Sequence, residues 1–266
     1  MLILASMLAL LALADLFTGG IAGAADSGFT RASRIGLVTA AAGLGAAALW
    51  VGTGAVWPVV SLLAVGLPGA LVWVEARAAR HPAGNRPRVA LVALGLNLLV
   101  AGLVLPAIFT APGSPWIGSY LSRLPWTAIQ GADPGVLLLT LAGLMFLGPT
   151  ANGIVRTCLQ LTRETPVAEA EQQLKGVRFI GPLERYLIFG LALAGEPTAA
   201  ALVLSAKSIL RFPDLQSQAA AANSSDPGSG KQVRPVDVLT EYFLIGSVLS
   251  WCLALAMTLP VLAITG

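Results

Sequence analysis

Long apolar runs separated by short polar loops are the feature that most limits what this chain can fold into. Several runs approach the roughly 20 residues that a helix needs to cross a lipid bilayer, for example at positions 89–110 and 236–264. Of the 266 residues, 56% are hydrophobic and 11% are charged, whereas soluble domains carry roughly 25% charged residues. The sequence therefore predicts an all-α integral membrane protein, folded as a polytopic bundle.

The apolar runs predict eight transmembrane helices in a single domain that covers residues 1–266. Pro68 is expected to kink the third helix, and GPTANG at 148–153 breaks the fifth near its middle. The Ser/Gly/Pro-rich residues 213–235 are expected to form a flexible cytoplasmic loop. The first helix lacks the positively charged start of a secretory signal, so it is predicted to be retained. The expected helices lie at about 2–21, 35–51, 59–73, 89–110, 136–161, 181–195, 197–211 and 236–264.

The basic residues predict an orientation. All Lys and Arg residues except Arg123 fall on one side of the eight expected helices. Positive loops stay in the cytoplasm, so both termini are predicted to lie outside, in an inner or plasma membrane. The net charge of +3 orients the chain and does not indicate a nucleic-acid partner. Membrane lipids are the expected partners, and a membrane-protein partner or a second copy of the chain stays open.

A cluster of charged residues in the last three helices is the main candidate site. It consists of Glu184, Arg185, Lys207, Arg211 and Glu241. Ionisable groups inside apolar segments are costly and therefore indicate function. With Glu196 at the tip of a full-length hairpin, Glu184 lies roughly 18 Å below that tip along the helix. A re-entrant hairpin that stops halfway is the alternative, and it would bury Glu196.

Three further polar residues join this candidate site. Asn152 and Arg156 lie four apart on one face of the fifth helix, at the same membrane surface. Asp15 either is a buried acid that needs a partner or marks the end of the first helix. We expect Lys207 to pair with Glu184 or Glu241. The competing interpretation of the whole set is a salt-bridge network that only locks helix ends together.

The sequence offers no reaction class. It contains no Walker loop, no G-x-S-x-G, no H-E-x-x-H and no C-x-x-C pair. His81 is the only histidine, and Cys158 and Cys252 are isolated and predicted to be packing residues. No cofactor, no metal site and no catalytic residue are therefore predicted. Catalysis ranks below binding or transport.

The C-terminal third resembles a widespread family of uncharacterised bacterial polytopic membrane proteins. The resemblance rests on the pair Glu184-Arg185, on the A-K-S-x-x-R-F run from Ala206 to Phe212, and on E-Y-F-x-I-G from Glu241. It covers about 80 residues. The family's N-terminal histidine and Asp-Phe pair are reduced here to ADLF around Asp15. The resemblance implies a bacterial membrane protein and implies no activity.

These observations lead to two functional hypotheses. The first is transport or binding of a small anionic ligand or a lipid at a charged intramembrane cluster that faces the cytoplasm, because cationic residues near a membrane surface attract such groups. The second is a non-catalytic accessory or structural subunit of a larger membrane complex. A self-paired charge network and small-residue faces such as AAAGLGAAA at 40–48 would suffice for it.

Overall fold

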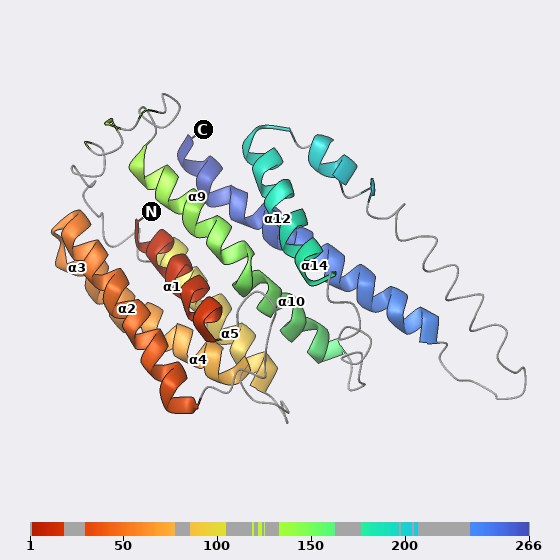
Figure 1. Cartoon of the computed structure of the whole chain (residues 1–266), viewed down its shortest axis with the longest axis horizontal. Helices are drawn as coiled ribbons and strands as arrows, with labels where there is room; N and C mark the ends of the chain where they lie inside the picture. Colours follow the sequence, from red (N-terminus) through yellow and green to blue (C-terminus); the bar gives the residue numbers. More distant parts are fainter. Residues whose placement is uncertain are drawn as a thin grey trace, which may run out of the picture.

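The computed structural model describes residues 2–18, 30–77, 86–104, 119, 122–123, 125, 133–162, 177–196, 198–203, 205–206 and 235–265. Every regular element in these ranges is a helix, so the described part of the chain is all-helical (Figure 1). The α-helices are α1 (Leu2–Thr18), α2 (Arg31–Thr53), α3 (Val56–Ser61), α4 (Leu67–Arg77), α5 (Arg86–Leu99), α9 (Pro134–Leu147), α10 (Pro149–Thr162), α12 (Val177–Leu193) and α14 (Pro235–Thr265), and two π-helical segments are η1 (Leu62–Gly66) and η2 (Val100–Val104).

Helix α1 lies at the centre of the bundle, where it packs against α2, α4, α9 and α10. Its side chains are apolar on almost every side, and Met7, Leu8 and Ala14 have no exposed surface. A helix that is apolar all round is normally a buried one. On the other side of α9, helix α12 packs against α14 (Figure 1). The centre of the molecule is thus built from α1, α9 and α10.

Small residues bring α2 close to its neighbours. Ala41, Ala42 and Ala46 are buried on one face of α2. A Cβ added at Gly45 would lie only 3.1 Å from Cδ2 of Leu62, so a side chain at this position would displace the leucine. Close backbone approach of this kind is how small residues support helix packing in lipid.

A π-helical turn, η1, lies directly before Pro68 and accommodates the proline. Proline has no N–H, and inside a helix its ring clashes with the carbonyl four residues earlier. In η1 the N–H of Leu67 donates to the carbonyl of Leu62, five residues back, directly before Pro68. The kink predicted at Pro68 is therefore a local widening of the helix. In the sequence, Pro106 follows the last residue of η2 at the same separation.

Two glycines end helices in different ways. At Gly148 the chain breaks between α9 and α10, which are bent by 43°. At Gly195 the backbone has φ of 77°, which suits glycine because it has no Cβ. The N–H of Glu196 donates to Leu191 O at 2.9 Å and that of Gly195 to Ala192 O at 3.2 Å. This is the Schellman motif that closes helix ends, and it leaves Glu196 exposed.

Fewer helices than expected are long and apolar enough to cross a membrane. Within the described ranges these are Arg31–Trp50, Val56–Arg77 and Leu244–Thr265, with a fourth if the bent pair α9 and α10 counts as one span. The expected number of eight is not supported. Helix α1 has only 17 residues, and α12, equally long, carries Arg178, Glu184 and Arg185.

Candidate functional site

Arg185 lies at the break between α9 and α10. Its side chain is 2% exposed. Nε donates to the carbonyl of Leu147 at 2.8 Å, Nη2 to the carbonyl of Gly148 at 3.5 Å, and Nη1 to Oγ of Ser250 at 3.0 Å. The last carbonyls of a helix have no partner within that helix and carry partial negative charge. The guanidinium therefore caps the end of α9 and ties it to α14.

The geometry of the break depends on Gly148. A Cβ added there would lie 2.5 Å from the hydroxyl of Tyr186, so the tyrosine would have to move. Pro149 follows as the first residue of α10, a position that suits proline because no N–H is needed there. Gly148 thus lets α12 approach the break closely enough for Arg185 to reach its carbonyls.

Glu184, the residue before Arg185, contacts α14 as well. Glu184 is 7% exposed, and its carboxylate accepts a hydrogen bond from Nε1 of Trp251 at 2.8 Å. Neighbouring residues of α12 thus meet neighbouring residues of α14, since Arg185 binds Ser250 and Glu184 binds Trp251. Buried polar groups need such partners to offset their lost hydration.

Asp15 is a buried acid with two partners. It is 3% exposed, and both its oxygens accept from Nε1 of Trp73, at 2.9 and 3.1 Å. Nη1 of Arg77 lies 2.5 Å from Oδ1. The guanidinium of Arg77 also stacks over the Trp73 ring, 5.1 Å from its centroid. Trp73 and Arg77 are four apart on α4 and so share a face, which joins α4 to the end of α1.

Arg77 extends this second cluster to α10. A Cβ added at Gly153 would lie 2.5 Å from Cζ of Arg77, so the arginine occupies the space that a side chain there would need. Gly153 is about 7.5 Å along α10 from Gly148, where Arg185 binds. The Arg77 and Arg185 clusters therefore contact the same short stretch of chain, at Gly153 and at Gly148.

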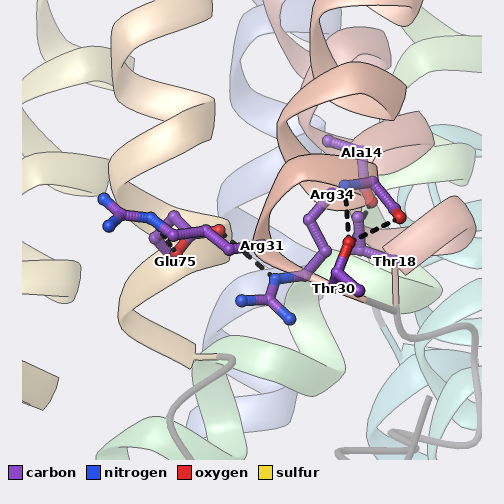
Figure 2. A network of polar contacts seen from close by, with 7 residues as sticks. Ala14, Thr18, Thr30, Arg31, Arg34 and Glu75 are labelled. Atoms are coloured by element: carbon purple, nitrogen blue, oxygen red, sulfur yellow. Dashed lines mark hydrogen bonds and ion pairs between the residues drawn. The ribbon is translucent and has the colours of Figure 1, made fainter. Parts of the chain in front are cut away.

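A third group of charges lies near the ends of α2 and α4. Glu75 accepts from Nε of Arg34 and lies near Nε of Arg31, each at 3.3 Å (Figure 2). The Arg31 side chain is 77% exposed, whereas those of Arg34 and Glu75 are 17% and 25% exposed. Thr30 caps α2 by accepting from the N–H of Ser33. This pairing positions α2 against α4 near the solvent-accessible end of the bundle.

The structure places only some of the predicted site residues. Glu184, Arg185 and Asp15 are buried and bonded as described above. Asn152 and Arg156 are half-buried on α10, and each makes further polar contacts. Lys207 and Arg211 lie outside the described residues, as does the side chain of Glu241, so the pairing predicted for Lys207 stays a prediction.

Several residues of the two clusters were missed from the sequence. Trp73, Trp251 and Ser250 were not predicted as partners, and Arg77 was counted only as a basic residue that orients the chain. A tryptophan well inside an apolar run could have signalled a buried N–H donor, because a buried indole N–H usually finds a partner. Within the described ranges, no group of His, Cys, Asp and Glu side chains is arranged to hold a metal ion.

Comparisons with known proteins found no family model, no curated protein and no solved structure that matches this chain.

Proposed function

We propose that this chain is a polytopic membrane protein that binds a small anionic ligand or an anionic lipid headgroup at the break between α9 and α10, for transport or for binding alone. The observation that carries the proposal is the surroundings of Arg185. Its three hydrogen bonds go to two carbonyls and a hydroxyl, and none of the ion pairs among the described residues includes it. A buried cation with neutral acceptors attracts an anion.

The bent pair α9 and α10 supports this proposal. Discontinuous helices inside membrane bundles form ligand sites in many transporters, because the helix starts point at anionic groups. The surface of the bundle agrees with a lipid environment. Leu44, Val92 and Leu259 are 73%, 69% and 66% exposed on α2, α5 and α14, and apolar side chains on several outward faces suit contact with lipid or with another membrane protein.

The proposed orientation puts the basic end of the bundle in the cytoplasm. Arg31, Arg34 and Arg77 lie together near the end of α4, as the positive-inside rule requires of cytoplasmic ends. The start of α1 and the end of α14 lie at the opposite end of the bundle (Figure 1). Both termini are thus proposed to be outside, in a bacterial inner membrane, in line with the family resemblance of the C-terminal third.

Native mass spectrometry of the purified full chain in lipid nanodiscs tests the proposal. We expect the wild type to retain an anionic metabolite or lipid, and Arg185→Gln to lose it. Arg88→Gln is the matched control, because Arg88 is an exposed arginine on α5, and it should retain the ligand. Size-exclusion chromatography and a melting curve show whether each variant is folded. A wild type that carries no anion, and binds none when offered phosphate, acetate or anionic lipid, contradicts the proposal.

A specific observation favours a second candidate, the accessory subunit. The Asp15 cluster satisfies itself, since both carboxylate oxygens have partners from α4. A network of this kind holds helices together and needs no ligand. Co-purification separates the two candidates. A stoichiometric protein partner without a bound small molecule supports the subunit.

A further inference from the structure

The start of α10 holds a buried hydroxyl without a hydrogen-bond partner in the described part of the chain. Thr150 has no exposed surface, and its hydroxyl has no hydrogen-bond partner among the described residues. The first bond at this helix start runs from the N–H of Asn152 to Gly148 O, at 3.4 Å. The N–H groups of Thr150 and Ala151 precede it and have no partner within α10. Thr150 is the second residue of α10, so its hydroxyl belongs to the same first turn as these amides.

Arg185 adds further donors beside them. Its bond to Gly148 O holds the guanidinium next to the residue that precedes α10. A guanidinium carries more N–H donors than its three bonds use here. The carboxylate of Glu184, the preceding residue on α12, accepts a hydrogen bond from Trp251. The groups that meet at the start of α10 are therefore hydrogen-bond donors, namely the first amides of α10, the Thr150 hydroxyl and the guanidinium of Arg185.

We propose that the start of α10, the Thr150 hydroxyl and Arg185 form a binding site for a single oxyanion, the carboxylate or phosphate group of the ligand. This inference rests on the proposed function and names its ligand class and its contact atoms. Helix starts bind phosphate and carboxylate through free N–H groups and the helix dipole, and arginine binds the same anions through paired N–H donors. Thr150 is fully buried. A bound anion therefore takes the place of protein atoms that now pack against Thr150 at the 43° bend between α9 and α10.

The test compares two isosteric threonine variants of the full chain in nanodiscs. Thr150→Val removes the unpartnered hydroxyl and keeps the shape of the side chain. Thr157→Val is the control, because Thr157 is a buried threonine of the same helix whose hydroxyl donates to Gly153 O at 2.8 Å. Binding of inorganic phosphate and of acetate is measured by titration in nanodiscs of neutral lipid. A second arm replaces the neutral lipid with phosphatidylglycerol and no added anion, to distinguish a free anion from a lipid headgroup.

We expect phosphate or acetate, or in the second arm the anionic lipid, to raise the melting temperature of the wild type and of Thr157→Val. Thr150→Val should bind about tenfold more weakly, because one hydrogen bond to a charged group is lost. Equal affinity of both variants and the wild type overturns this inference and leaves the proposed function standing. No anion binding by the wild type overturns both. A further outcome is that Thr150→Val melts at a higher temperature than the wild type without any anion and binds the anion with the same affinity. In that case the hydroxyl is only an unpaired buried group, and the proposed site is overturned.

Discussion

Replacing Asp15 with asparagine should destabilise the bundle more than any loss of charge at its exposed end. The asparagine keeps the size of the side chain and one oxygen for the indole of Trp73, and it removes the charge that faces Arg77. The carboxylate side chain is 2% exposed and that of Arg77 is 22% exposed. Removing one partner of a buried pair costs about 3 to 5 kcal/mol. Because Arg77 is partly hydrated, we expect the lower end, about 3 kcal/mol.

Thermal unfolding in detergent measures the effect. For a domain of this size, 1 kcal/mol corresponds to roughly 2 to 4 °C, so the melting temperature should fall by about 6 to 12 °C. Arg31→Gln is the control, since the Arg31 side chain is 77% exposed and Glu75 keeps its second partner Arg34, and surface pairs contribute about 0 to 1 kcal/mol. Adding Arg77→Met to Asp15→Asn should cost less than the sum of the two single changes. Equal losses for Asp15→Asn and Arg31→Gln would refute the idea that burial makes this pair strong.

Three further changes probe the helix junctions. Gly148→Ala places a Cβ against the Tyr186 hydroxyl and should cost about 1 to 3 kcal/mol by overpacking; adding Tyr186→Phe should restore part of the melting temperature, and no recovery would contradict the clash. Gly195→Ala forces a side chain into a backbone with φ of 77°, which should cost about 1 kcal/mol, and an unchanged melting temperature would show that the turn relaxes. Trp251→Phe removes one N–H donor of Glu184 and should cost about 1 to 3 kcal/mol, whereas a loss within the error of the melting curve would mean that another group replaces the indole.

The helical class and the position of the main helix break could be predicted because both depend on local sequence. Apolar runs of helical length and the residues GPTANG are visible without any knowledge of packing. For Asp15 the sequence leaves two interpretations open, a buried acid that needs a partner or the end of the first helix, and the structure shows the acid buried and bonded. The number of membrane-crossing helices is harder to predict, since α1 and α12, at 17 residues each, fall below the roughly 20 residues of a typical crossing.

The partners of the buried acids depend on tertiary structure. Trp73 lies 58 residues from Asp15, and Trp251 lies 67 residues from Glu184. A tryptophan in a membrane protein is first expected at the headgroup level. Its place well inside an apolar run can mark a buried N–H donor, but nothing local identifies the carboxylate that accepts from it. Arg77 follows Glu75 closely in a basic stretch and reads as a loop cation. Only the packing of α4 against α1 turns it toward Asp15.

The π turn before Pro68 determines where this chain can lose one residue without rotating the helix that follows. A π turn holds one residue more than the α-helical turn it replaces, so the faces of α3 and α4 are one residue out of step with a regular helix. Loss of one residue from Leu62–Gly66, combined with replacement of Pro68, would give a continuous α-helix that keeps both flanks facing as they do now. Relatives that lack a proline at position 68 should therefore be one residue shorter in the segment Leu62–Gly66. Their counterparts of Trp73 and Arg77 should still face Asp15.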